Sequence, residues 1–241
     1  MGESPVAVDD KAVESLVSGA FTSFGRDHRG RYPNELWVTH LTGCMRRAFF
    51  SIRFNADPVR SGDAILGRIL HYVSKEVLDP HLAKLLGDDF VLEWEKDVSY
   101  QFETPDGDPW LIKGRADLVV YDPNGNAYEV WEFKFTSHER FNQAIPIYVG
   151  QANAYAVMSG AHFARLVLVN RNTFAVRSIS MSADESGFKH LVERAQNLID
   201  CLRKDTVPVG PELDWECKFC PFSLICVKAR EWLSQSKLGV G

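Results

Sequence analysis

The sequence lacks any apolar run that approaches the roughly 18 residues a helix needs to cross a membrane. Close to the amino terminus, Asp9, Asp10 and Lys11 interrupt the chain where a secretory signal would need its hydrophobic region. A myristoylation signal is missing as well, because Val6 stands where that pattern requires serine or threonine. These absences predict a cytoplasmic protein that does not bind membranes.

An excess of basic residues is also missing. The formal net charge at pH 7 is -5, whereas proteins that coat nucleic acid without specificity are usually basic. The charge still allows a nucleic-acid enzyme with a local basic groove. The candidate groove is formed by Arg46, Arg47, Arg53, Arg60 and Arg68. A solvated helix face explains these arginines equally well.

No internal repeat, low-complexity tract or linker is evident, so we expect a single domain over residues 1–241. Apolar residues recur at helical spacing over residues 12–24, 63–78, 143–158 and 184–203. Another helix is expected to start with Thr39 as its N-cap and to carry Cys44 within its first two turns. Strand-like runs cover residues 91–102, 110–121, 127–135, 165–170 and 174–181. Helices and a mostly antiparallel sheet predict an α/β or α+β fold.

The run WEFKF in the third of these strands contains charged residues among aromatic ones. Side chains alternate along a strand, so Trp131, Phe133 and Phe135 share one face and Glu132 and Lys134 share the other. The aromatic face is expected to join the core. The charged face would ordinarily be solvated, with the lysine discouraging aggregation at a sheet edge.

The preceding turn determines what lies opposite Glu132. A two-residue turn at Asn124 and Gly125, or a four-residue PNGN loop, pairs positions whose numbers sum to 249. Asp117 then stands opposite Glu132, with Cβ atoms roughly 5 Å apart. A three-residue turn would shift this register by one. Opposed carboxylates repel each other, so the pair needs a compensating cation, and a divalent metal ion is the simplest candidate.

Two carboxylates and a lysine on one sheet face suit the hydrolysis of a phosphodiester. Oxygen ligands hold Mg²⁺ or Mn²⁺, which lowers the pKa of a bound water and neutralises charge that develops on the phosphate. Lys134 would position the attacking water and stabilise the transition state.

These residues carry a resemblance to a known family. Asp117 followed by Glu132 and Lys134 resembles the D…ExK core of the PD-(D/E)XK nuclease superfamily. Gly67 and His71, which share one helix face, resemble the GxxxH helix of its RecB-like branch.

The helix expected after the ExK strand extends the resemblance, because Gln151 and Tyr155 in GQANAYAV resemble the QxxxY motif of the same branch. Ala116 departs from the pattern, since many relatives have proline before the aspartate, but that position varies within the superfamily. Ordinary packing of Gln151 and Tyr155 is the alternative.

The resemblance implies a restriction-endonuclease-like core over about residues 63–181, with a mixed sheet flanked by helices. The implied catalytic residues are Asp117, Glu132 and Lys134. The implied ligands of Mg²⁺ or Mn²⁺ are His71, Asp117, Glu132 and the main-chain carbonyl of Phe133. The candidates for contact with DNA are Gln151, Tyr155, Arg46 and Arg47.

The cysteines resemble those of the iron-sulfur nucleases in this branch. Cys217, Cys220 and Cys226 form CxxCxxxxxC near the end of the chain, and Cys44 lies far upstream. The resemblance implies that the four thiolates hold one cluster, with 4Fe-4S favoured over 2Fe-2S. Such a cluster would tie the tail, residues 213–230, to the N-terminal helical region.

Structural zinc is the alternative for these cysteines, although zinc sites more often use two close CxxC pairs. Disulfides are disfavoured in a reducing cytosol. Cys201 matches no ligand position and is expected to be a packed thiol.

Among these nucleases, a compact chain without a helicase motor resembles the CRISPR-associated exonuclease family called Cas four, over residues 38–226. The resemblance implies cleavage of single-stranded DNA, typically 5′ to 3′, and a role in spacer acquisition beside the Cas one and Cas two integration proteins. A related nuclease of DNA repair or phage origin is the first alternative. A DNA-binding scaffold without cleavage activity is the second, and the complete set of Asp117, Glu132 and Lys134 argues against it.

Overall fold

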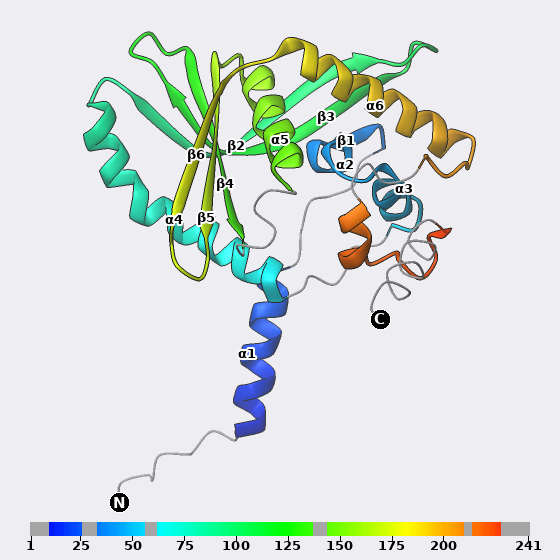
Figure 1. The fold of residues 1–241 in the computed structure, drawn as a ribbon, viewed down its shortest axis with the longest axis horizontal. Helices are drawn as coiled ribbons and strands as arrows, with labels where there is room; N and C mark the ends of the chain where they lie inside the picture. Colours follow the sequence, from blue (N-terminus) through cyan, green and yellow to red (C-terminus); the bar gives the residue numbers. More distant parts are fainter. Residues whose placement is uncertain (1–9, 26–32, 56–61, 137–143, 210–213, 228–241) are drawn as a thin grey trace, which may run out of the picture.

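The computed structural model describes residues 10–25, 33–55, 62–136, 144–209 and 214–227 (Figure 1). The strands are β1 (Glu35–Trp37), β2 (Val91–Glu103), β3 (Pro109–Tyr121), β4 (Ala127–Thr136), β5 (Phe163–Asn170) and β6 (Val176–Ser182). The helices are α1 (Asp10–Gly25), α2 (Val38–Thr42), α3 (Met45–Arg53), α4 (Gly62–Leu86), α5 (Ile145–Ser159), α6 (Glu185–Arg203) and the 3-10 helix η2 (Asp214–Phe219).

All six strands belong to one mixed sheet, with β3 at the point where three neighbours meet. Strand β2 pairs antiparallel with β3 along one edge. On the other edge, β1 pairs parallel with the beginning of β3, and β4 pairs antiparallel with its end. Strand β5 is parallel to β4, and β6 is antiparallel to β5. The predicted mixed sheet flanked by helices is therefore confirmed.

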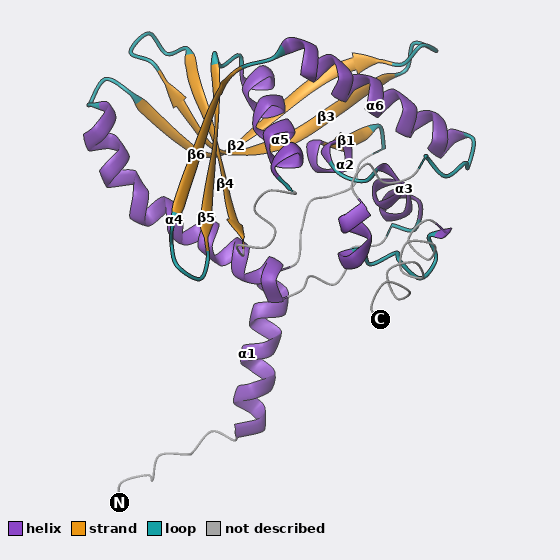
Figure 2. Ribbon diagram, in the orientation of Figure 1, coloured by secondary structure: helices purple, strands orange, loops and turns teal. Residues whose placement is uncertain are grey.

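Helices cover both faces of this sheet (Figure 2). Helix α4 packs on one face, where Leu82 joins Leu118, Val120 and Phe133 in a buried apolar cluster. Helices α5 and α6 pack on the opposite face, in a larger core that includes Val119. Along β4, Val130 joins the larger core, whereas Phe133 joins the cluster beneath α4, as expected for alternating side chains. The charged face of β4 therefore looks toward α5, and its aromatic face toward α4.

The helix expected after Thr39 begins at Val38, with Trp37 in place of Thr39 as its N-cap, and it is broken in two at Gly43. The prediction that Cys44 lies within its first two turns is therefore wrong. Gly43 has an extended backbone (φ -102°, ψ -157°), and Cys44 is the N-cap of α3. The break is held by Arg194 of α6, whose guanidinium donates to the carbonyls of Leu41 and Gly43 at 2.6 and 2.8 Å. A long-range contact therefore determines where α2 ends.

Other elements agree with the predictions apart from their ends. Helix α4 continues through Pro80 to Leu86, eight residues beyond the expected end at Leu78. The three-residue strand β1 was not predicted. Helix α6 starts as expected, because the carboxylate of Asp184 accepts a hydrogen bond from the Ser186 N–H at 2.9 Å.

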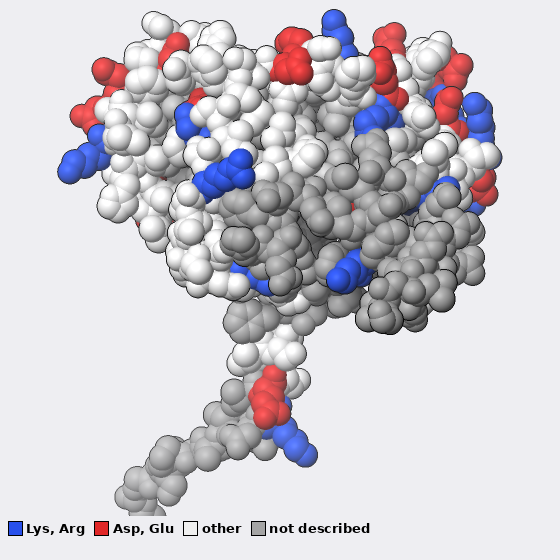
Figure 3. Space-filling model, viewed as in Figure 1, with Lys and Arg blue, Asp and Glu red and all other residues white. Residues whose placement is uncertain are grey.

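The surface agrees with the acidic composition. Figure 3 shows several acidic side chains along the upper rim of the viewed face, with lysines and arginines scattered over the rim and the rest of the face, and no continuous basic patch among the described residues of that face. Within the described segments, no helix combines the length and the apolar character that membrane crossing requires.

Candidate active site

The hairpin between β3 and β4 has the register that the sequence predicted, although its turn differs. Leu118 pairs with Trp131, and Val119 with Val130, so the paired numbers sum to 249. The loop has three residues, 123–125, because the N–H of Asp122 donates to the carbonyl of Asn126 at 2.8 Å. A register shift between Val120 and Tyr121 offsets the one-residue change that this turn introduces.

Asp117 lies one position beyond the last of these pairs and is bound to the strand that carries Glu132. Its Oδ2 accepts a hydrogen bond from the main-chain N–H of Phe133 at 2.7 Å. The same oxygen lies 3.4 Å from Nδ1 of His71, which reaches the sheet from α4. The ring of His71 also packs edge-on against Phe135, with 5.3 Å between ring centroids. The structure thus brings together side chains from three elements.

Glu132 is the most deeply buried acidic group of the site, with 2% of its surface exposed. Its Oε1 accepts a hydrogen bond from the ammonium of Lys134. Its Oε2 is buried and has no hydrogen-bond partner in the described structure. A buried carboxylate oxygen without a partner is costly, so this atom is suited to a ligand such as a metal ion.

Burial perturbs the pKa of both carboxylates, and repulsion by Asp117 adds to it at Glu132. Burial, with the charge of Asp117 as the second cause, raises the pKa of Glu132 to about 7. Burial also raises the pKa of Asp117 to about 6, against the opposing charge of Lys134. Burial and the nearby Lys134 lower the pKa of His71 to about 4, so its imidazole is neutral at physiological pH and can act as a ligand.

Lys134 keeps its positive charge in this setting. Burial disfavours its ammonium, but the charges of Glu132 and Asp117 outweigh burial and raise its pKa. Among the described residues, no three His, Cys, Asp or Glu side chains converge in metal-binding geometry. The donor set of one neutral imidazole and two carboxylates nevertheless suits Mg²⁺ or Mn²⁺, and the free oxygen of Glu132 provides a point of attachment.

The affinity for a divalent ion is expected to fall as the pH is lowered from about 8 to about 6. Glu132 and Asp117 must be deprotonated to bind a metal, and their raised pKa values of about 7 and about 6 lie in this interval. Each proton released on binding changes the affinity by ~10-fold per pH unit below the pKa. Calorimetric titration with Mn²⁺ in the absence of DNA measures the effect, and an affinity that stays constant over this interval would contradict it.

The two residues of the predicted QxxxY motif, both on helix α5, have different surroundings from each other. Tyr155 is in the core, and a Cβ atom at Gly114 of β3 would come within 2.3 Å of its ring. Gln151 is also buried, and its Oε1 has no hydrogen-bond partner in the described structure. Gln151 therefore has a free acceptor, whereas Tyr155 packs the helix on the sheet. Contact of either residue with DNA stays a prediction.

Two residues near the site were not identified from the sequence. Glu95 of β2 occupies the position opposite Asp117, between the pairs that join Trp94 to Leu118 and Lys96 to Ala116. It has a left-handed backbone (φ 54°), and its charge adds to the burial that raises the pKa of Asp117. Because β2 and β3 pair in one constant register, Glu95 could have been identified from the sequence as the residue opposite Asp117.

Tyr148 is the second such residue, and it lies in the first turn of α5. The Nζ atom of Lys134 is 5.3 Å from the centroid of its ring. No motif in the sequence pointed to Tyr148, because its position depends on how α5 packs on β4.

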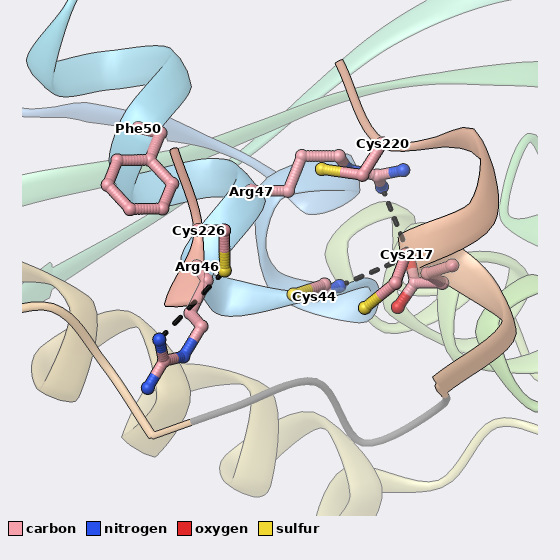
Figure 4. Close-up of a pocket in the computed structure, with 8 residues that line it drawn as sticks. Cys44, Arg46, Arg47, Phe50, Cys217, Cys220 and Cys226 are labelled. Atoms are coloured by element: carbon pink, nitrogen blue, oxygen red, sulfur yellow. Dashed lines mark hydrogen bonds and ion pairs between the residues drawn. The ribbon is translucent and has the colours of Figure 1, made fainter. Parts of the chain in front are cut away.

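A second candidate site lies where the tail meets α3. One pocket is lined by Cys44, Arg46, Arg47, Phe50, Glu216, Cys217, Cys220 and Cys226 (Figure 4). It therefore gathers the four cysteines that the sequence singled out from two distant segments. Burial raises the pKa of Cys44 and of Cys220, so these thiols are protonated unless a metal displaces the proton.

Polar contacts fasten this pocket from both segments. The Oε1 of Glu216 accepts a hydrogen bond from the main-chain N–H of Cys44 at 3.3 Å and lies 3.5 Å from Nη2 of Arg47. On the other side of the pocket, Nη1 of Arg46 lies 3.9 Å from Sγ of Cys226. The Nε of Arg46 is buried and has no hydrogen-bond partner in the described structure.

The other residues of the predicted basic groove lie elsewhere or outside the described residues. Arg53 forms an ion pair with Asp205 at 2.7 Å, and Arg60 is outside the described residues. Cys201 lies on α6 and packs against the core, where its thiol is 3.4 Å from Oδ1 of Asn197. The predicted contact of Arg46 and Arg47 with DNA stays untested, and both side chains face the cysteine pocket (Figure 4).

Comparisons with known proteins point to one family. A model of the PD-(D/E)XK nuclease superfamily matches residues 22–227. A CRISPR-associated exonuclease Cas4 from Saccharolobus solfataricus is 28% identical over 200 residues, which cover 80% of this chain and 87% of the relative. The crystal structure of SSO0001 has the same fold, with a TM-score of 0.68 at 22% identity, covering 89% of this chain and 97% of that one.

Proposed function

Because the chain belongs to the PD-(D/E)XK nuclease superfamily and is therefore a metal-dependent DNA-hydrolysing enzyme, we propose that its active site is formed by His71, Asp117, Glu132 and Lys134. The observation that carries this proposal is the unpartnered Oε2 of Glu132, buried beside a second carboxylate whose pKa is also raised. Two buried carboxylates that repel each other are unfavourable for folding alone, so a functional cation explains their retention.

A divalent metal bound here would supply a water of lowered pKa and would neutralise charge on the scissile phosphate. The neutral imidazole of His71 and the carboxylates of Asp117 and Glu132 would hold it, together with the main-chain carbonyl of Phe133. The hydrogen bond from the Phe133 N–H fixes the carboxylate of Asp117 relative to β4. The ammonium of Lys134 would orient the attacking water and stabilise negative charge in the transition state.

Within this chemistry, the substrate we propose is single-stranded DNA, degraded from its 5′ end during CRISPR spacer acquisition. The similarity to the CRISPR-associated exonuclease of Saccharolobus solfataricus supports the exonuclease activity and the CRISPR context of this proposal. Association with the Cas one and Cas two integration proteins is part of the same proposal. DNA contacts by Gln151, with its free acceptor, and by Arg46 and Arg47 belong to it as well.

We further propose that Cys44, Cys217, Cys220 and Cys226 hold an iron-sulfur cluster, of the 4Fe-4S type, that ties the tail to α3 within a single domain. All four line one pocket. The buried, unpartnered Nε of Arg46 also fits a sulfur-rich group at this position, because metal-bound thiolates and bridging sulfides both accept hydrogen bonds.

Degradation of end-labelled single-stranded DNA tests the proposed substrate and direction. With Mn²⁺, a 3′-labelled strand should shorten progressively, while a 5′-labelled strand should release its label as short products from the start. A 5′ end blocked by a bulky group should slow degradation by ~10-fold or more, because binding of the free end precedes cleavage. Progressive shortening of the 5′-labelled strand would contradict the polarity, and cutting unaffected by EDTA would contradict the metal site.

A further inference from the structure

The ammonium of Lys134 must stay in one place to act on a water molecule. The flexible side chain of the lysine cannot fix that position without other contacts. A lysine has a flexible four-carbon stem with high rotamer entropy. Among the described residues, the ammonium of Lys134 contacts the carboxylate of Glu132 and the ring of Tyr148, whose centroid lies 5.3 Å away. The geometry therefore identifies which groups can restrict the lysine.

These two contacts differ in how they depend on the metal. Glu132 is a proposed metal ligand, so its carboxylate is shared with the ion when the site is loaded. The ring of Tyr148 has no metal-ligand role, and it belongs to the first turn of α5, where its N–H donates to the Ala144 carbonyl at 3.2 Å. The aromatic contact can therefore restrict the ammonium of Lys134 whether or not a metal is bound.

We propose that Tyr148 is a positioning residue for the nuclease reaction, whose ring face holds the ammonium of Lys134 in place while Glu132 binds the metal. The attraction comes from the negative face of the aromatic ring and does not require the phenol hydroxyl. This inference rests on the role proposed for Lys134 above. It assigns to α5 a part in catalysis that is separate from the QxxxY motif one turn later.

Substitutions at Tyr148 separate the ring from the hydroxyl. Tyr148→Leu should lower kcat by ~10-fold, the size expected for a cation–π contact partly shielded from water, and leave KM for single-stranded DNA within about twofold. Tyr148→Phe should stay within about twofold of the wild type in kcat. Tyr128→Leu removes an aromatic ring at the other end of β4 and serves as the matched control, with kcat expected to be unchanged.

A double-mutant cycle tests whether Tyr148 acts through Lys134. In single-turnover assays, adding Tyr148→Leu to Lys134→Met should cause no further loss, because the ammonium that the ring holds is already gone. Mn²⁺ affinity measured without DNA should be the same in Tyr148→Leu and the wild type. Equal losses for Leu and Phe, a change in KM alone, or a further ~10-fold loss in the double mutant would overturn the proposal. Full activity of Lys134→Met alone would instead remove the role of Lys134 and, with it, that of Tyr148.

Discussion

Asp117→Asn is expected to lower DNA cleavage by at least ~100-fold while the protein stays folded. Asparagine has nearly the same shape, and its side-chain oxygen can still accept the hydrogen bond from the Phe133 N–H. It removes one negative charge from the pair that must hold the metal, and the loss of one well-placed electrostatic group typically costs this much. Initial rates on single-stranded DNA with saturating Mn²⁺ measure the effect.

The stability of the same variant provides an independent check. Asp117 and Glu132 repel each other in the metal-free protein, which helps to raise the pKa of Glu132. Removing one charge should therefore leave the Tm of the metal-free protein unchanged or higher, as is common when a functional site is dismantled. Asp89→Asn, in the exposed loop between α4 and β2, is the matched control and should keep full activity. Loss of folding in Asp117→Asn, or cleavage that remains near the wild-type rate, would contradict the assignment.

Cys217→Ser is expected to abolish the visible absorption of the purified protein, to reduce its iron content and to destabilise the fold. A cluster held by Cys44 and the tail would cross-link distant parts of the chain. Closing a loop of more than about 100 residues stabilises a fold by ~4–5 kcal/mol in the chain-entropy relation for cross-links. This is a large fraction of the free energy of unfolding of a typical domain.

Cys201→Ser is the control for this experiment, because its thiol lies on α6 beside Asn197 and does not line the cysteine pocket. It should retain colour, iron and Tm. Absorption spectra, iron and zinc analysis, and thermal unfolding under anaerobic conditions distinguish the variants. A colourless wild-type protein with one equivalent of zinc would contradict the cluster.

The active-site hairpin could be predicted from sequence because its register depends on local features. Alternation along β4 and the turn residues between the strands were enough to place Asp117 near Glu132. The actual turn has three residues, the form expected to shift the register by one, and the shift between Val120 and Tyr121 restores the pairing. Such a shift depends on the packing of the whole sheet. The pairing of β3 with β4 was therefore predicted correctly, although the turn that joins the strands was not.

Features that depend on distant contacts could not be predicted in this way. The break between α2 and α3 is held by Arg194 and Glu216, which lie far along the chain. The contact of Tyr148 with Lys134 requires α5 to be placed on β4, which no local pattern specifies. By contrast, Glu95 could have been found, because the pairing of β2 with β3 follows one constant register.

In the active site proposed here, His71, Asp117 and Glu132 together bind one divalent ion. Crystals soaked in Mn²⁺ test it directly through the anomalous scattering of the metal. We predict a strong anomalous peak between the carboxylates of Asp117 and Glu132, within ~2.0–2.4 Å of an oxygen of each. A soaked crystal with ordered side chains and no peak there, or with manganese bound only elsewhere, would contradict the account.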